Sequence, residues 1–562
     1  MIAGLTIDRS PKESLRQRLG DNVVDNASRA EMDQILKKKV FDFQSKSQAK
    51  TLYRKTTEIT PLIDFIKEKL LSNGDHEKVK SRIIVLGNRM TPMATSKTEA
   101  PTAQLQSFYM LVFIAAKRGI KLLSKDVTGA FLNADLEPTE IVYVKLNRKM
   151  ATLVLQLDSS LAEFVLDDGS MIAKLLKCLY GMGISPQRWY KTIRELMRKL
   201  GFSESSWDPC FFFKIEKNDV LNFVLLYVDD LLIACENKKL EIEIGKAMIA
   251  EFEGVSTQEG DNISYLGFTI TQTNEQITLD QSGYIMKMMK SLDINMNMVP
   301  KHTNPFASDF KINNDRYLKP AQEADKSLMF KMKHLAMSLM YVAGRTRRDL
   351  LFASSFFAGI KCPTVDDIAA VKRAIVYAYN TIEKKQIFYR KGRIEMSGVG
   401  DASHSLFADT RGQGSGIIFG DEHSAALEMS SNVEKFLSKS SYESELVLQN
   451  KLAMMMKRTM LMFNECGIQV STPMIQHCDH LEVVRTINKE HLLKSGPTKF
   501  MSRSLFQLFA EVVNKIINFV WIKSKRNRAD IGTKDLQGKQ FQILADQTFS
   551  RLKDLPEEEE AQ

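Results

Sequence analysis

The sequence of 562 residues is poor in the features that mark disulfide frameworks, zinc ribbons and membrane spans. It has six cysteines, and no two of them form a Cys-x-x-Cys pair. This argues against a zinc ribbon or a disulfide-stapled scaffold and fits a reducing compartment. No run approaches the roughly 18 apolar residues of a membrane span, and the first residues lack a signal-peptide layout. We therefore expect a soluble, intracellular protein.

The remaining composition is that of an ordinary globular protein with excess positive charge. Hydrophobic residues make up 44% and charged residues 26%, which is enough for several cores. The length predicts three or four domains. The formal net charge of +10 favours a polyanionic partner, most economically nucleic acid, although many basic proteins bind nothing acidic.

Residues 223–234 place two adjacent carboxylates between two short apolar runs. The runs predict buried strands, and Asp229 with Asp230 predicts a tight hairpin turn between them. Ionised carboxylates between buried strands are costly unless a positive charge offsets them, and hard oxygen ligands suit Mg²⁺ or Mn²⁺. A solvated turn is the plain alternative. The rare Tyr-Val-Asp-Asp tetrad inside a strand–turn–strand favours the metal site.

A third carboxylate and a basic pair lie upstream of this hairpin. Strand 120–127 contains Asp126 near its end, and a lone aspartate there is more often a cap. Asp126 becomes a stronger candidate for the metal site because two metal ions need a further carboxylate to hold them. Lys80 and Arg82 share one face of an apolar strand by two-residue alternation. Such a pair is usually only solvated.

Other elements are expected from periodicity alone. Helical periodicity is found around 31–43, 61–71, 107–118, 187–200 and 240–252, and strands are expected at 141–146, 211–215, 264–271 and 276–279. In the last third of the chain, Asp401 follows a short strand, Glu443 opens a helix to about Asn464, Asp479 ends a strand and Asp530 lies in a loop. Each has a plain structural explanation, since the helix dipole alone favours Glu443.

The ordered series of motifs resembles the reverse transcriptase region of copia-type LTR retrotransposons. The motifs are Lys80-x-Arg82, Lys125-Asp126-Val127, Ala130-Phe131-Leu132-Asn133, Leu179-Tyr180-Gly181, Pro186-x-x-Trp189, Tyr227-Val228-Asp229-Asp230, Tyr265-Leu266-Gly267 and Thr346-Arg347-x-Asp349. The resemblance as a whole runs from about residue 75 to the last sixty residues or so.

The resemblance implies an α+β and α/β multidomain fold, in which a right-hand polymerase of fingers, palm and thumb is followed by a ribonuclease H-like domain. The implied divisions are an N-terminal extension (1–75), fingers, palm and thumb (76–295), a connection region (296–392), the ribonuclease H-like domain (393–545) and an acidic tail (546–562).

The implied activity is DNA synthesis on RNA and DNA templates by two-metal phosphoryl transfer. Asp126 and Asp229 would bind the metal ions directly and Asp230 less directly. The other implied roles are triphosphate binding by Lys80 and Arg82, exclusion of the ribose 2′-hydroxyl by Phe131, nucleotide binding by Tyr227, and the primer grip by Leu266 and Gly267.

The implied second activity is ribonuclease H cleavage of the RNA strand in RNA·DNA hybrids. Its metal-binding carboxylates would be Asp401, Glu443, Asp479 and Asp530. The cofactor would be two Mg²⁺ ions at each site, with Mn²⁺ as the alternative. The implied partners are an RNA template, a DNA primer, RNA·DNA hybrid and dNTPs, with no membrane and with a homodimer left open. The implied location is a cytoplasmic virus-like particle, with nuclear entry left open.

The chain also departs from this family. The template loop reads Tyr-Gly-Met-Gly-Ile-Ser-Pro, so Gly183 and Ile184 replace a Lys and a Gln. Ser403 replaces a second aspartate, and 498–502 lacks a His and an Asp. No protease or integrase segment precedes residue 1, so a processed polyprotein product and a truncated gene both remain. Two rival functions are a non-catalytic remnant that binds nucleic acid and a structural subunit of a dimer.

Overall fold

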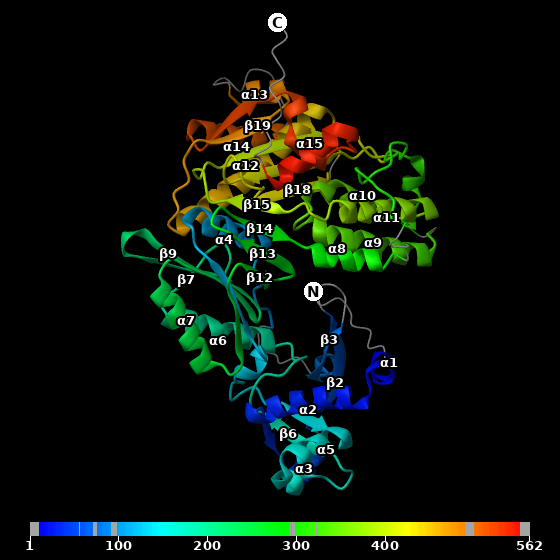
Figure 1. The fold of residues 1–562 in the computed structure, drawn as a ribbon, viewed down its shortest axis with the longest axis vertical. Helices are drawn as coiled ribbons and strands as arrows, with labels where there is room; N and C mark the ends of the chain where they lie inside the picture. The colour runs from blue at the N-terminus through cyan, green and yellow to red at the C-terminus, as the bar shows by residue number, and fades with distance from the viewer. Residues whose placement is uncertain are drawn as a thin grey trace.

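The computed structural model describes residues 10–55, 57–70, 76–90, 98–292, 294, 298–321, 324–435, 437–488 and 499–550. These residues form helices and four β-sheets, which confirms the predicted α/β multidomain fold class. Figure 1 shows an elongated molecule, with the N-terminal third at one end and the last third of the chain at the other.

The first part of the chain, which we call the fingers after the predicted domain, contains one five-stranded sheet in the order β1-β6-β5-β2-β3. Its elements are α1 (Ser10–Leu19), α2 (Asp21–Lys37), β1 (Phe41–Phe43), α3 (Lys46–Arg54), β2 (Ile59–Leu70), β3 (His76–Val85), β5 (Tyr143–Leu146), α5 (Arg148–Leu157) and β6 (Met171–Leu175). The predicted division at 75/76 between an N-terminal extension and the fingers falls between the paired strands β2 and β3, so the residues before it belong to the same sheet.

Two expectations for the fingers were wrong. The segment 61–71 is not helical but forms most of β2, which pairs with β3 along its length. Leu62 and Ile66 are both buried, and a spacing of four places residues on one face of a helix and of a strand alike. The helix around 31–43 ends at Lys37, and 41–43 is a strand. Both segments are strands because they pair with other strands of the sheet, β1 with β6 and β2 with β3.

The palm is built on a six-stranded sheet in the order β11-β4-β10-β9-β8-β7. Its elements are α4 (Leu105–Arg118), β4 (Leu122–Val127), α6 (Ser185–Lys199), β7 (Ser203–Glu204), β8 (Phe211–Glu216), β9 (Val220–Tyr227), β10 (Asp230–Cys235), α7 (Lys238–Glu251) and β11 (Val255–Gln258). Helix α4 is buried from Ser107 to Ala116, so it forms the centre of the molecule.

A four-stranded sheet and a helical bundle follow the palm. They consist of β12 (Asn262–Tyr265), β13 (Phe268–Gln272), β14 (Gln276–Asp280), α8 (Ser282–Lys290), α9 (Lys326–Ala343), α10 (Leu351–Gly359), α11 (Val365–Asn380) and β15 (Gln386–Tyr389). Ile285 and Met289 of α8 share one core with Leu339 of α9 and Val371 of α11. The predicted division at 295/296 therefore falls inside this bundle.

The C-terminal domain has the sheet order β18-β17-β16-β19-β20, with the first three strands antiparallel and the last two parallel to β16. Its elements are β16 (Ser397–Ser403), β17 (Gln413–Phe419), β18 (Glu428–Val433), α12 (Ser441–Glu465), β19 (Met474–Cys478), α13 (Leu481–Ile487), α14 (Lys499–Val513), β20 (Ile517–Trp521) and α15 (Gly538–Phe549).

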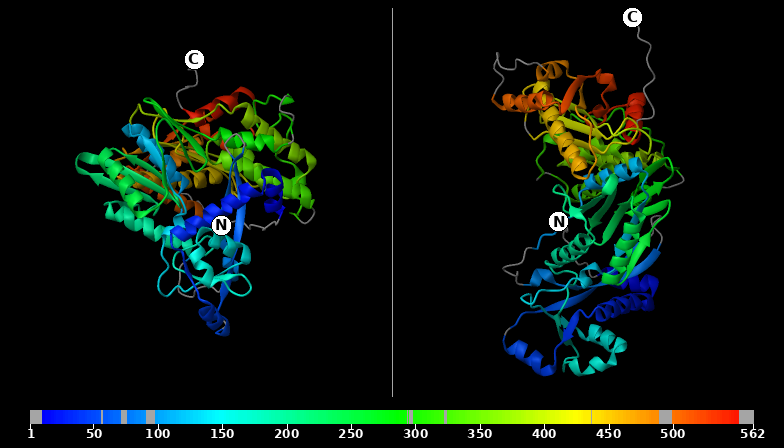
Figure 2. Two further views of the ribbon diagram at one scale, coloured as in Figure 1. Left: turned by 60° about the horizontal axis from the view of Figure 1, so that its bottom comes forward. Right: turned by 90° about the vertical axis from the view of Figure 1, so that its left-hand side faces the viewer.

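The palm and the C-terminal domain share one continuous hydrophobic core. Lys117 of α4 forms a buried ion pair with Asp421, which follows β17. Ser205 and Ser206 of the palm donate hydrogen bonds of 2.6 Å to Glu465 at the end of α12. In the right-hand view of Figure 2 the C-terminal domain lies directly above the palm. The two domains are therefore docked tightly.

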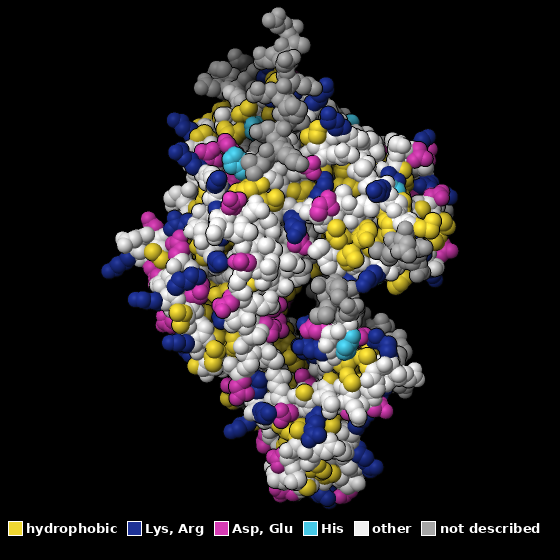
Figure 3. Space-filling view, in the orientation of Figure 1, with side chains coloured by type: hydrophobic (Ala, Val, Ile, Leu, Met, Phe, Trp, Pro, Cys, Tyr) yellow, Lys and Arg dark blue, Asp and Glu magenta, His cyan; other side chains and the backbone are white. Residues whose placement is uncertain are grey.

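The space-filling view in Figure 3 is hollowed between the fingers and the helical bundle, beside the palm. Within the described ranges, no helix combines the length and the apolar character that crossing a membrane requires.

Candidate active sites

The palm brings its three predicted carboxylates together on adjacent strands. Asp126 of β4 lies directly opposite Asp230 of β10 in antiparallel register, and Asp229 lies in the turn between β9 and β10. Directly opposed side chains in such a pair have Cβ atoms about 5 Å apart. The backbone N–H of Val127 donates to the carbonyl oxygen of Asp229 at 3.1 Å and fixes the turn against β4.

The pKa shifts of these carboxylates reflect their burial and mutual repulsion. Burial, followed by the charges of Asp229 and Asp126, raises the pKa of Asp230 to about 7. The pKa of Asp126 is raised by burial and by Asp229, and the charge of Lys80 opposes both shifts. Carboxylates that repel each other in this way lose that repulsion when a divalent cation binds between them.

The turn that carries Asp229 has a strained backbone. Val228 has a φ of +58°, although valine is β-branched and rarely adopts a positive φ. Its carbonyl accepts a 2.5 Å hydrogen bond from the indole N–H of Trp189, which lies in the predicted Pro-x-x-Trp motif. A positive φ at the first turn residue is the geometry of a type II′ hairpin turn. Such strain is typical of functional sites.

Two of the predicted nucleotide-binding residues, Arg82 and Phe131, are connected through the ring of Tyr180. The guanidinium carbon of Arg82 lies 5.7 Å from the centre of the Tyr180 ring, and that ring meets Phe131 edge-on at 5.5 Å. Lys80 and Arg82 are exposed on β3, as the alternation predicted. Tyr227 is 36% exposed at the end of β9, next to the carboxylates. The roles of these residues stay predictions.

The template loop is fixed to the fingers by close backbone contact. Gly181 has a φ of +89°, and a Cβ there would lie 2.1 Å from the carbonyl oxygen of Val85. The backbone N–H of Val85 donates to the backbone carbonyl oxygen of Tyr180 at 2.8 Å. Ile184, where the family has a Gln, is only 4% exposed and packs in the fingers core. Its side chain therefore stabilises the loop instead of facing solvent.

The predicted primer grip is a two-residue turn between β12 and β13. Leu266 and Gly267 both have a positive φ, of 49° and 79°. The Tyr341 hydroxyl of α9 donates to the Leu266 carbonyl at 3.5 Å, and Tyr265 donates to the Leu225 carbonyl of β9 at 3.2 Å. The turn is thus anchored to the strand that leads into the carboxylate hairpin.

A second acidic group lies in the C-terminal domain. Gly400 of β16 pairs with Cys478 of β19 in parallel register, so Asp401 and Asp479 leave the sheet side by side. Asp530 lies in the 3₁₀ turn Arg528–Gly532, next to them. Among the described residues, this is the one group of three His, Cys, Asp or Glu side chains whose ligand atoms lie within 4.8 Å of one another.

Glu443, the fourth predicted carboxylate, does not join this group. It lies in the first turn of α12, where its carboxylate accepts a hydrogen bond of 2.7 Å from the backbone N–H of Lys439. Glu445, two residues further along, lies beside Asp401 instead: its carboxylate accepts from the Ala402 backbone N–H at 2.9 Å and is 3% exposed. Burial and the charge of Asp401 raise the pKa of Glu445 to about 8.

The correction follows from helical geometry. Glu445, Gln449, Leu452 and Met456 follow the i, i+4, i+7, i+11 spacing of the helix face that packs on β16, whereas Glu443 points away from it. This periodicity was present in the sequence and would have identified Glu445.

Lys534 and Thr533, which sequence reasoning gave no role, contact the acidic group directly. The Lys534 ammonium lies 2.8 Å from Asp530 and 3.5 Å from Asp401. The Thr533 hydroxyl donates to Asp401. Burial, with the charge of Asp401, still raises the pKa of Asp530 to about 7.

The segment 498–502, where the sequence departs from the family, is only partly described. Thr498 lies outside the described residues, and for 499–502 only the backbone is described.

Both acidic groups have the donor chemistry that Mg²⁺ or Mn²⁺ requires, because all ligand atoms are hard carboxylate oxygens. The C-terminal group also has the geometry, with three carboxylates converging within 4.8 Å. The palm carboxylates are more widely spread in this structure, since they do not meet that distance limit.

Comparison with known proteins agrees with this geometry. Residues 66–306 match the family described as "Reverse transcriptase (RNA-dependent DNA polymerase)". The chain is 23% identical over 481 residues to the retrovirus-related Pol polyprotein from transposon TNT 1-94 of Nicotiana tabacum, covering 84% of the chain and 34% of the relative. It is 22% identical over 537 residues to the transposon Ty1-LR2 Gag-Pol polyprotein of Saccharomyces cerevisiae, covering 92% and 28%.

Residues 66–306 therefore resemble the reverse transcriptase family. The retrotransposon relatives confirm the predicted resemblance to copia-type LTR elements. The chain spans about a third or less of the length of these relatives. Among solved structures, a foamy viral protease-reverse transcriptase in complex with double-stranded DNA is 12% identical, with a TM-score of 0.47 and coverage of 87% of this chain and 68% of that chain.

Proposed function

We propose that this protein is an RNA- and DNA-templated DNA polymerase, that is, a reverse transcriptase. The observation that carries the proposal is the opposition of Asp126 and Asp230 across β4 and β10, with Asp229 in the adjoining strained turn. No plain structural role explains three neighbouring carboxylates in a partly buried position, because their repulsion destabilises the fold.

In the proposed reaction the primer 3′-oxygen forms a bond to the α-phosphorus of a dNTP, and the bond to pyrophosphate breaks. Two Mg²⁺ ions, when bound, would stabilise the charge on the attacking and leaving oxygens. Asp126 and Asp229 would hold the ions, with Asp230 acting less directly. Lys80 and Arg82 would bind the triphosphate, where Arg can form two parallel hydrogen bonds. Phe131 would exclude a ribose 2′-hydroxyl.

We further propose that the C-terminal domain cleaves the RNA strand of RNA·DNA hybrids. The convergence of Asp401, Asp479 and Asp530 within 4.8 Å supports a metal site there, and Glu445 adds a fourth carboxyl beside Asp401. The Lys534 ammonium, which pairs with Asp530, would have to move or share that carboxylate when a metal ion binds. Hybrids would be distinguished by groove shape and 2′-hydroxyl contacts. We place the protein in a cytoplasmic virus-like particle.

The test is extension of a DNA primer on an end-labelled RNA template with dNTPs and Mg²⁺. The control is the double variant Asp229→Asn, Asp230→Asn. We expect the parent to extend the primer and shorten the RNA, and the variant only to shorten it. A parent that binds the hybrid but neither extends nor cuts it with Mg²⁺ or Mn²⁺ would instead support the non-catalytic remnant. Activity that appears only on mixing with an active partner would support the structural subunit.

A further inference from the structure

One face of the hairpin formed by β2 and β3 carries five positive charges. In the antiparallel register Lys67 lies directly opposite Lys80, and Lys69 lies directly opposite Lys78. Arg82 follows Lys80 by two residues, so its side chain lies on the same face of the strand. All five residues are exposed. We call these five residues the basic face.

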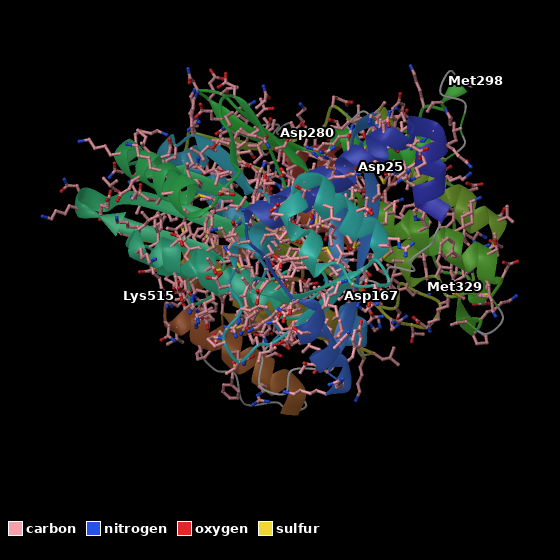
Figure 4. All side chains as sticks on the ribbon, turned by 90° about the horizontal axis from the view of Figure 1, so that it is seen from below. Asp25, Asp167, Asp280, Met298, Met329 and Lys515 are labelled. Atoms are coloured by element: carbon pink, nitrogen blue, oxygen red, sulfur yellow. The ribbon has the colours of Figure 1, made fainter. Side chains whose placement is uncertain are left out.

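The opposite face of the hairpin is covered by the first two helices. Ile66 of β2 packs in one core with Leu15 of α1 and with a residue of α2. Figure 4 labels Asp25 on this α2 helix. On the same side, Glu68 pairs with Arg18 of α1. Because successive strand residues point to opposite faces, the basic face is the one that α1 and α2 leave uncovered.

Few carboxylates of the described ranges neutralise the basic face. Glu77 lies 3.0 Å from the Lys69 ammonium and 3.9 Å from the Lys78 ammonium. Lys67 and Lys80 form no ion pair with a described residue. Like charges directly opposite each other on paired strands destabilise the pair. Two such pairs on an exposed face are suited to a polyanion, because its charges offset the repulsion.

The basic face belongs to the part of the fingers that borders the hollow beside the palm. Figure 3 shows Lys and Arg side chains over β2 and β3 next to this hollow. Burial raises the pKa of Asp126 in the palm, and the charges of three lysines of the basic face oppose that rise. The positive potential of the basic face therefore extends to the palm carboxylates.

The spacing of the basic face fits a nucleic-acid backbone. Cations two residues apart on a strand lie about 7 Å apart, which is close to the spacing of successive phosphates in a nucleic-acid strand. The proposed triphosphate site uses only Lys80 and Arg82. We propose that Lys67, Lys69 and Lys78 bind backbone phosphates of the nucleic acid, either in the single-stranded template or in the duplex. This inference rests on the proposed polymerase function, which supplies that nucleic acid.

The test measures how salt weakens the binding of nucleic acid to the full-length protein without dNTPs. The probes are a blunt RNA·DNA hybrid and the same hybrid with a single-stranded extension of the RNA template. The double variant Lys67→Gln, Lys78→Gln should make the slope of log affinity against log salt less steep, by about 0.7 for each lysine on a single strand and about 0.9 on a duplex. The control is Lys121→Gln in the palm, because Lys121 is 55% exposed, compared with 59% for Lys78, and pairs with Asp261. It should leave the slope unchanged.

The two probes identify the strand that is bound. A weaker salt dependence with the extended probe alone would assign the lysines to the template, and with both probes to the duplex. The charge-retaining double variant Lys67→Arg, Lys78→Arg should keep the slope of the parent.

Three results would overturn the proposal. One is an unchanged slope of the Gln variant with both probes. Another is a change confined to the KM for dNTPs in primer extension, which would assign the lysines to the triphosphate. The third is an equal loss of slope in the Arg variant, because charge would then not be the cause. A parent that binds with the expected slopes but does not extend primers would refute the polymerase and leave the phosphate contacts standing.

Discussion

At the scale of single residues, two glutamates of α12 make the C-terminal site testable. Glu445 lies against Asp401, whereas Glu443 only accepts a hydrogen bond from Lys439. Glu445→Gln should lower RNA cleavage by at least about a hundredfold, because removing a charged group at a metal site weakens the site strongly. Glu443→Gln should stay within about threefold. Cleavage of an end-labelled hybrid measures both, and the reverse order of effects would refute the assignment.

The same glutamate predicts a pH dependence of stability. The folded-state pKa of Glu445 is about 8, well above its ordinary value, so the metal-free folded state binds more protons than the unfolded state between about pH 4 and 8. By linkage, the contribution of Glu445 to stability falls as pH rises through this window. Relative to the parent, metal-free Glu445→Gln should gain at least about 1 kcal/mol between pH 5 and pH 8.

Urea unfolding in EDTA at both pH values measures this difference. A gain that does not grow with pH would contradict the raised pKa of Glu445. Added Mg²⁺ should stabilise the parent more at pH 8 than at pH 5, because the ion binds the deprotonated carboxylates.

At this scale the sequence identified most of the carboxylates that the structure brings together, because each lies in a local motif; their roles stay predictions. Asp229 and Asp230 lie in one tetrad between two apolar runs, and Asp126 ends a recognisable strand. Glu443 and Glu445 are two residues apart at the start of one helix, and only the helix face that packs on β16 separates them. The hydrogen bond from Lys38 to Asn133 joins residues 95 positions apart, and no local pattern encodes it.

At the scale of elements, the contact between the template loop and β3 depends on Gly181. A methyl group there would lie 2.1 Å from the Val85 carbonyl oxygen, and the φ of +89° is itself unfavourable for alanine. Gly181→Ala should therefore lower the free energy of unfolding by more than about 3 kcal/mol and abolish extension.

A matched control is Gly359→Ala at the end of α10, where a Cβ would have no neighbour within 4 Å and φ is not positive. It should change stability by less than about 0.5 kcal/mol. Urea unfolding at pH 7 compares the two. Equal effects would mean that the loop can move away from β3.

Element types were harder to predict than site residues. Strand β2 has apolar residues at a spacing of four, which fits a helix as well as a strand, and its pairing with β3 decides the outcome. The family resemblance implied a division between thumb and connection at 295/296, which lies between α8 and α9. The shared core of these helices is a tertiary feature that no linker composition reveals.

At the scale of the whole molecule, the buried ion pair of Lys117 and Asp421 predicts coupled unfolding of the palm and the C-terminal domain. Both side chains are nearly inaccessible, at 3% and 1%. Breaking a buried pair costs about 3–5 kcal/mol because the remaining charge is uncompensated. Asp421→Ala should therefore split a single calorimetric transition into two. Asp261→Ala, which removes an exposed partner of Lys121, is the control and should leave one transition.

The continuous core between the palm and the C-terminal domain has a geometric consequence. It fixes the distance between the two acidic groups, so the two groups would contact a bound hybrid at a constant separation along its length. Each cut in the RNA would then fall a constant number of nucleotides behind the primer end, whatever the sequence of the template. Asp421→Ala, which would loosen the contact between the two domains, would instead give RNA products of several lengths.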